Sequence, residues 1–237
     1  MTPPIMPPAH LALIYELLIA TYGEPKNEPD YDPLGGLVGT ILSQHTSDIN
    51  SERAYQQLIT TFPTWEEVRD APTHEVADAI RSGGLANIKA PRIQDALLTL
   101  TEQQQAQGGT KSLSDYLSDE LAKRTPEEAW HYLRSISGVG PKTAACVLMF
   151  NLGLPVMPID THVHRVSKRL GLIRSNVNAD QAHEIFAKIT PPAWVYPLHV
   201  NLIHHGRLIC HAQKPECDKC PLYSACAFVG NGNRILS

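Results

Sequence analysis

Apolar residues recur along this chain of 237 residues with helical spacing, and no stretch of useful length alternates between apolar and polar residues as a strand would. Residues 37–42 are apolar on all sides, which is typical of a buried helix. The other predicted helices span about 10–22, 48–61, 74–81, 88–106, 115–123, 126–135, 141–152, 161–170, 179–189 and 197–209. The pattern therefore predicts an almost entirely helical protein.

Polar residues at the predicted helix starts support these ranges. Ser47 or Asp48 is placed to cap the helix that runs to about residue 61. Pro126 suits the first position of a helix, because its missing N–H costs nothing there. Capping-box spacing, which lets two side chains bond to each other's backbone, occurs at Thr64 with Glu67, Thr125 with Glu128 and Asn178 with Gln181.

Composition sets broad limits on location and size. Hydrophobic residues make up 43% of the chain, and no apolar run reaches the length needed to span a membrane. The start, Met1–Pro8, is rich in proline and lacks the basic and long apolar segments of a signal peptide. We therefore expect a cytoplasmic protein, associated with the nucleoid if its source is bacterial. Its length suits one large domain or two small ones.

The net charge of −4 argues against a generic binder of polyanions. The charge is uneven, however, since residues 160–237 hold nine Lys/Arg against five Asp/Glu, while residues 1–159 are strongly acidic. A basic surface that faces phosphates and an ordinary solvated surface both remain open interpretations of this excess.

The stretch Gly138-Val139-Gly140-Pro141-Lys142 lies between two predicted helices. Its two glycines allow a tight hairpin whose backbone N–H groups face outward, and Pro141 suits the first position of the next helix. A phosphate fits against those N–H groups and the positive end of that helix. The motif therefore predicts an anchor for a nucleic-acid backbone, with the Lys142 amine beside it.

Four of the five cysteines cluster near the C-terminus as Cys210-x6-Cys217-x2-Cys220-x5-Cys226. Thiolates are soft ligands, and such clustering can surround one metal centre. A disulfide framework does not fit a chain that lacks a secretory signal. Spacing favours an iron–sulfur cluster over zinc, because four-thiolate zinc sites more often use two Cys-x2-Cys pairs, but it leaves zinc open. Cys146 is predicted to be a buried, small apolar residue.

The order of these motifs resembles the endonuclease III family of DNA-repair glycosylases. Residues 136–144 are similar to its helix-hairpin-helix, and 159–165 to its catalytic aspartate segment. Residues 205–207, leading into the four cysteines, resemble its cluster loop, and 42–48 and 84–90 resemble its two DNA-facing loops. The resemblance runs from about residue 34 to 226, and a hairpin, a lysine, an aspartate and four cysteines in this order are a specific combination.

The resemblance implies an all-α fold of two helical domains with a DNA-binding cleft between them. One domain is a six-helix barrel with the helix-hairpin-helix, at 26–154, and the other, from 1–25 and 155–237, holds the cluster. It also implies a 4Fe–4S cluster ligated by Cys210, Cys217, Cys220 and Cys226. The implied partner is double-stranded DNA that contains damaged bases or abasic sites, bound by a monomer with no membrane attachment.

Residue chemistry then assigns the catalytic roles. Base excision builds positive charge on the sugar, which the Asp160 carboxylate is suited to stabilise. Lys142 is suited to attack the anomeric carbon as a neutral amine, and the positive helix end disfavours its ammonium form. The resulting iminium permits β-elimination, so the pair predicts a bifunctional glycosylase and abasic-site lyase acting on oxidised pyrimidines.

The target base must leave the duplex to reach such a site, so residues that contact DNA are expected in both loops. Leu85 matches the family's apolar wedge, whereas His45 replaces its usual Gln and Ala86 its usual Tyr, which predicts an altered opposite-base preference. Lys168 and Arg169 are additional candidate phosphate contacts. The predicted DNA-binding residues are Gly138, Val139, Gly140, Thr143, His45, Leu85, His162 and Arg165.

Two alternatives differ from the bifunctional enzyme. A monofunctional mismatch glycosylase would activate water and typically lacks a lysine at the position of Lys142. A non-catalytic DNA-binding iron–sulfur module would have no use for Lys142 and Asp160 together. Four histidines near the cysteines are predicted to pack or to face DNA and not to bind metal; these are His199, His204, His205 and His211.

Overall fold

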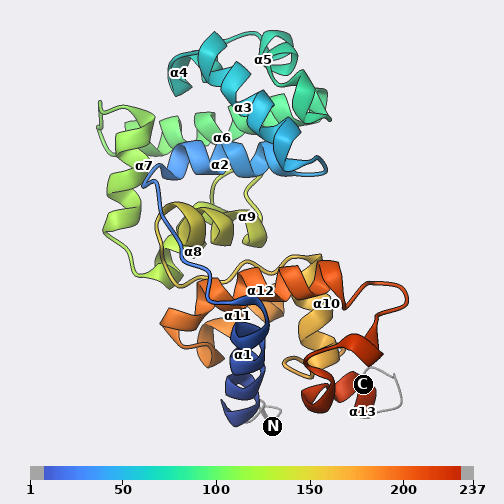
Figure 1. Cartoon of the computed structure of the whole chain (residues 1–237). Coiled ribbons are helices and arrows are strands. Elements are labelled where there is room, and N and C mark those ends of the chain that lie inside the picture. Colours follow the sequence, from blue (N-terminus) through green and yellow to red (C-terminus); the bar gives the residue numbers. More distant parts are fainter. Residues whose placement is uncertain (1–7, 231–237) are drawn as a thin grey trace. The chain divides into compact units, whose positions relative to one another are not determined.

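The computed structural model describes residues 8–230, and this part of the chain contains helices and no strand (Figure 1). The all-α prediction is therefore confirmed. No helix within the described residues is long and apolar enough to cross a membrane.

The chain forms two compact units. One consists of Glu28–Leu154, and the other combines Met1–Asn27 with Pro155–Ser237. The domain boundaries predicted from the sequence, at residues 26 and 154, lie close to these. We call Glu28–Leu154 the middle unit and the other the terminal unit.

Eight α-helices build the middle unit: α2 (Pro33–Ser43), α3 (Asp48–Thr61), α4 (Trp65–Asp70), α5 (Thr73–Ala79), α6 (Ala86–Ala106), α7 (Leu113–Ala122), α8 (Pro126–Arg134) and α9 (Pro141–Cys146). Two short elements complete it, the 3₁₀ turn η1 (Arg81–Gly83) and the π-helical segment η2 (Val147–Asn151) that continues α9. The range predicted for 141–152 thus changes its hydrogen-bonding pattern at Val147. Cys146 is partly exposed, not buried as predicted.

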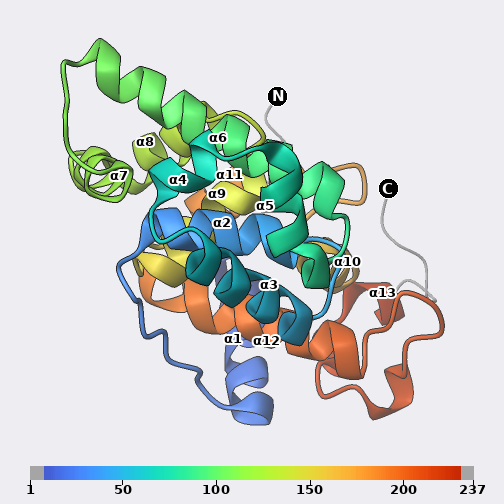
Figure 2. The ribbon, with the colours of Figure 1, turned by 90° about the horizontal axis from the view of Figure 1, so that it is seen from above.

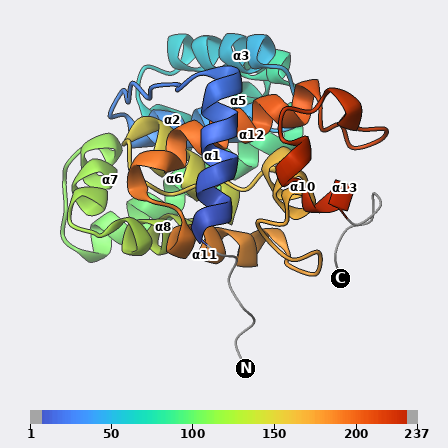
Figure 3. The ribbon, with the colours of Figure 1, turned by 60° about the horizontal axis from the view of Figure 1, so that its bottom comes forward.

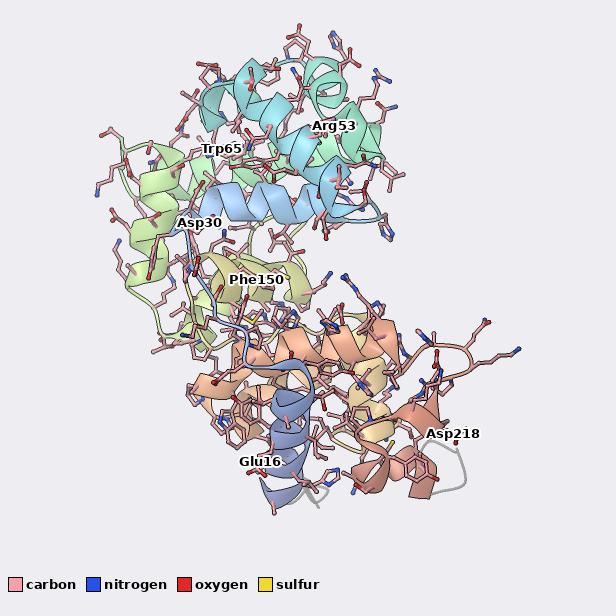
Figure 4. The ribbon with its side chains drawn as sticks, viewed as in Figure 1. Glu16, Asp30, Arg53, Trp65, Phe150 and Asp218 are labelled. Atoms are coloured by element: carbon pink, nitrogen blue, oxygen red, sulfur yellow. The ribbon has the colours of Figure 1, made fainter. Side chains whose placement is uncertain are left out.

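Helix α2 is the centre of the middle unit, packed against α3, α6, α7 and α9 (Figure 2). Its side chains Leu34, Leu37 and Leu42 are fully buried, which confirms that residues 37–42 form a buried helix. The segment before α2 is bound to η2, because Asn151 Nδ2 donates to Asp30 Oδ1 over 2.9 Å. Figure 4 labels Asp30 on this segment. Asn151 also closely approaches Gly36, where a Cβ would lie 2.0 Å from Asn151 Oδ1.

The terminal unit joins α1 (Pro8–Tyr22) to α10 (Thr161–Leu170), α11 (Ala179–Ile189), α12 (Val195–Leu208) and α13 (Ala227–Gly230). Helix α1 packs against α12, and α10 packs against α12 and α13 (Figure 3). Three 3₁₀ turns also belong to it: η3 (Pro192–Trp194), η4 (Cys217–Lys219) and η5 (Tyr223–Ala225). The two turns in the cysteine loop were not predicted, because single turns carry no periodic pattern.

Helix starts follow the predicted capping chemistry. Complete capping boxes occur at Thr125 with Glu128 and at Asn178 with Gln181. At α4 only half of the predicted box forms, with the Thr64 side chain accepting from the Glu67 N–H. Ser47, and not Asp48, caps α3.

Candidate functional site

The hairpin between α8 and α9 adopts the tight turn that its glycines suggested. Gly138 has φ +75°, a backbone conformation that favours glycine. Val139 has a buried side chain, and its N–H donates to the Ile136 carbonyl over 3.1 Å. Gly140 occupies the N-cap position of α9, and the Trp130 indole donates to the Pro141 carbonyl over 3.0 Å. These contacts hold the inner side of the turn. Because the Val139 side chain is buried, a DNA contact by Val139 stays a prediction for its backbone only.

Lys142 and Thr143 point in different directions from the first turn of α9. The Lys142 side chain is exposed, whereas Thr143 is buried and its Oγ1 lies 3.5 Å from Gln44 Nε2. Gln44 Oε1 lies 3.5 Å from Arg92 Nη1 as well. Gln44 thereby links α9 to the loop after α2. Of Lys142 and Thr143, only Lys142 presents its side chain to solvent. The Thr143 side chain is therefore not available to DNA, and a contact by its backbone stays a prediction.

The two loops predicted to face DNA are built alike. His45, between α2 and α3, has φ +55°, and Leu85, directly before α6, has φ +53°. Neither residue is glycine, so each conformation carries backbone strain. Both side chains are exposed, with 49% of Leu85 accessible although it is a large apolar residue. Ala86 begins α6 and is partly buried.

Sequence reasoning missed the role of Lys89 in this region. Its side chain is only 1% exposed, and its Nζ donates to the carbonyls of Leu42 over 2.6 Å and Gly83 over 2.8 Å. Burial lowers the pKa of Lys89, while the two carbonyl acceptors favour its charged form. The helical spacing of apolar residues could have indicated that Lys89 is buried, because Lys89 lies four and eight residues before the buried Ile93 and Leu97, on the same face of α6.

Asp160 lies at the start of α10 in the terminal unit. Its Oδ1 accepts from the Val163 N–H over 2.7 Å, so the residue is the N-cap of this helix. One turn later, Arg165 Nη2 donates to the carbonyls of Gly206 over 2.9 Å and Cys210 over 3.0 Å. It also lies 3.2 Å from His162 Nδ1. Arg165 thus binds the end of α12 and the start of the cysteine loop, and a DNA contact by Arg165 or His162 stays a prediction.

Arg169 performs a second binding role on the same loop. Its guanidinium donates to the His211 carbonyl over 2.6 Å, to the Ala212 carbonyl over 2.9 Å and to Cys210 Sγ over 3.3 Å. The residue is buried, so the predicted phosphate contact by Arg169 is wrong. Lys168, its neighbour, is partly exposed.

The four clustered cysteines line one small pocket together with Arg169, His205 and Phe228. None forms a disulfide. Within residues 8–230, no three Cys, His, Asp or Glu side chains converge closely enough to hold a single metal ion. A zinc ion needs all its thiolates at about 2.3 Å, whereas a four-iron cluster binds each thiolate at a separate iron. Four thiolates around one pocket are the donor set of an iron–sulfur cluster or of a zinc site.

Burial of the thiols in this pocket bears on metal binding in general. Burial raises the pKa of the Cys220 thiol to about 11, and it also raises the pKa of Cys217. The raised pKa values mean that burial disfavours the thiolate form of these cysteines. A bound metal centre would reverse this, because a thiol that coordinates a metal is deprotonated and its charge is compensated.

The neighbouring histidines differ in burial and in the groups that they contact. His205 is buried, which lowers its pKa to about 4 and keeps the ring neutral. Its Nδ1 lies 2.9 Å from the Tyr22 hydroxyl and its Nε2 lies 3.6 Å from Cys220 Sγ. His199 is buried as well, while His204 is exposed and stacks on Tyr22 with ring centroids 4.9 Å apart. His211 lies 3.7 Å from Glu216.

Comparisons with known proteins give a consistent result. A family model described as HhH-GPD superfamily base excision DNA repair protein matches residues 38–192. Endonuclease III of Thermotoga maritima is 31% identical over 204 residues, which cover 86% of this chain and 87% of that protein. Endonuclease III of Rickettsia felis is 33% identical over 216 residues, covering 91% and 92%.

Solved structures share the architecture. A trapped endonuclease III–DNA covalent intermediate, in an estranged-adenine complex, matches with a TM-score of 0.74 and 27% identity, over 97% of this chain and 100% of that one. A thermostable thymine-DNA glycosylase matches with a TM-score of 0.72 at 19% identity, over 94% and 98%. The second likeness concerns the fold alone.

Proposed function

The chain belongs to the HhH-GPD superfamily of base excision DNA repair proteins, and from this membership we propose that it is a bifunctional DNA glycosylase and abasic-site lyase. Its proposed substrates are double-stranded DNA with oxidised or otherwise damaged pyrimidines and DNA with abasic sites. One observation carries the lyase assignment: Lys142 is exposed in the first turn of α9, directly after the hairpin.

The proposed chemistry assigns one step to each catalytic residue. The Lys142 amine attacks the anomeric carbon, the glycosidic bond breaks, and its electron pair leaves with the base, which takes up a proton. The Asp160 carboxylate stabilises the positive charge that develops on the sugar. The attacking nitrogen then loses a proton, the bond between the anomeric carbon and the ring oxygen breaks, the ring oxygen takes up a proton, and a lysine imine forms. Loss of a proton from the neighbouring sugar carbon expels the 3′ phosphate by β-elimination, because the imine accepts the electron pair. This releases the damaged base and cuts the strand.

Around this chemistry we propose three supporting roles. The turn at Gly138–Gly140 binds the phosphate backbone, and His45 and Leu85 occupy the space that the extruded base leaves. Cys210, Cys217, Cys220 and Cys226 hold a 4Fe–4S cluster, which supplies a structural centre for the loop and no step of the reaction. We expect a monomer to carry out the reaction.

Borohydride trapping on an abasic duplex tests the proposal, because reduction of a lysine imine joins protein and DNA covalently. Wild type is expected to form the adduct and Lys142→Ala to form none, while both are assayed for strand cleavage on a panel of lesion duplexes. Lys188→Ala is a matched control, because Lys188 is an exposed lysine near the end of α11. Retained trapping by Lys142→Ala would overturn the imine assignment. Base release by wild type without trapping would instead favour a monofunctional glycosylase.

A further inference from the structure

A buried ammonium joins two segments of the middle unit that are far apart in sequence. Lys89 Nζ reaches the Leu42 carbonyl at the end of α2 and the Gly83 carbonyl at the end of η1. The backbones meet closely here, because a Cβ on Gly83 would lie 3.0 Å from Ala54 Cβ and 3.9 Å from the Leu42 oxygen. The amine therefore occupies a junction between these segments.

Packing alone does not explain a lysine at this position. The neighbouring residues on the same face of α6 are Ala90, Ile93 and Leu97, all fully buried, so an apolar side chain would continue the stripe. A buried ammonium carries a large desolvation penalty, which close acceptors have to offset. Both acceptors are carbonyls at the C-terminal ends of helical segments, where negative partial charge collects. These two carbonyls compensate the charge of the Lys89 ammonium, and the ammonium in turn holds the two carbonyls together.

Each carbonyl precedes an exposed residue with a strained backbone. Leu42 is followed three residues later by His45 at φ +55°, and Gly83 two residues later by Leu85 at φ +53°. Positive φ at a non-glycine residue persists only where the surrounding structure enforces it. The Lys89 contacts lie just before both of these residues.

We propose that Lys89 is a positioning residue that couples the loops 43–47 and 84–88 into one rigid element, so that His45 and Leu85 enter the DNA duplex together. The inference rests on the proposed function, in which these two side chains fill the space of an extruded base. A lysine that only stabilised the fold would affect melting without a selective effect on the two loops.

The first test needs no DNA. Amide hydrogen exchange is measured on wild type, Lys89→Met and Lys89→Gln. Both variants are expected to exchange faster in 43–47 and 84–88 together, while the rest of the unit is unchanged. The matched control is Lys111→Met, which removes an exposed lysine of the same unit. Faster exchange in only one loop, or in neither, overturns the coupling, and so does failure of both variants to fold, because Lys89 would then be a general folding residue.

The second test measures insertion. The probe is a duplex with a tetrahydrofuran abasic analogue opposite 2-aminopurine, whose fluorescence rises when the base is unstacked. Lys89→Met is expected to lose about tenfold in this signal, since small misplacement of a supporting shell has effects of this size or larger. Its affinity for an undamaged duplex is expected to stay within about threefold, because phosphate contacts supply non-specific binding.

A variant set separates the two proposals. If wild type gives neither insertion nor covalent trapping, the proposed function fails, and the exchange result still decides the coupling. If wild type is active and Lys89→Met inserts equally well, the inference fails alone. The loss in Leu85→Ala combined with Lys89→Met is expected to be smaller than the product of the two single losses, because Lys89 acts in part through Leu85. Fully additive losses contradict the positioning role.

Discussion

Asp160 Oδ1 lies 2.7 Å from the Val163 backbone nitrogen, so the carboxylate proposed to stabilise charge on the sugar also caps helix α10. One oxygen is engaged in the cap, and the side chain remains partly exposed. Structural and chemical contributions of this residue therefore need separate variants.

Asp160→Asn keeps an oxygen that can accept from the Val163 N–H, whereas Asp160→Ala removes the cap. In thermal unfolding, the stability of Asp160→Asn is expected to be close to that of wild type, and the free energy of unfolding of Asp160→Ala to be lower by about 1 kcal/mol. Base release should fall by about 100-fold or more in both, because neither carries a negative charge. Near-normal base release by Asp160→Asn would remove the carboxylate from the proposed chemistry.

Arg169→Met removes the donors to the His211 and Ala212 carbonyls and to Cys210 Sγ. We expect loss of visible thiolate-to-iron absorbance in the presence of an iron chelator to be about tenfold faster, as is typical when a group that orients a metal ligand is removed. Arg174→Met is the control, because Arg174 is exposed between α10 and α11. Equal rates for the two variants would show that Arg169 does not support the cysteine loop. Wild type without this absorbance would refute the iron–sulfur assignment.

His45→Gln is expected to change the ranking of cleavage rates among the four bases placed opposite one lesion. Imidazole and amide present different donors and acceptors to the unpaired base. The measurement is single-turnover cleavage of four duplexes, with His131→Gln as control, since His131 is an exposed histidine on α8. An unchanged ranking would mean that His45 does not read the opposite base.

Glu120 predicts a pH dependence of stability in the middle unit. Its carboxylate is almost completely buried and accepts from Lys123 over 2.7 Å, with Arg124 at 2.9 Å. The Lys123 hydrogen bond, opposed by burial and assisted by Arg124, lowers the pKa of Glu120 below its ordinary value of 4.5. A carboxyl whose pKa is lower in the folded state stabilises the fold above its unfolded pKa, and loses that contribution as pH falls through the folded pKa.

Glu120→Gln is therefore expected to lose about 1–3 kcal/mol at pH 7. The difference from wild type should shrink as the pH is lowered below about 4.5. Denaturant unfolding at a series of pH values measures this, with the exposed Glu127→Gln as control. A difference that is independent of pH would exclude the carboxylate charge as its origin.

Local chemistry in the sequence determined the helices and the order of the motifs. The boxes at Thr125 and Asn178, the turn at Gly138 and the buried stripe of α2 depend on residues a few positions apart, so the sequence pattern predicts them directly. The motif order also identified the family, because Lys142, Asp160 and the four cysteines need only be read in succession.

The tertiary structure alone decided which polar side chains are free and which hold the loops. Lys89, Arg165 and Arg169 appear in the sequence as ordinary surface charges, yet their partners lie 47, 45 and 42 residues away. Such contacts exist only after packing has brought distant carbonyls together. The apolar stripe of α6 could indicate that Lys89 is buried, but no local pattern identifies its partners. Long-range packing thus separates the exposed Lys142 from the buried Lys89, although both are lysines in the first turns of helices.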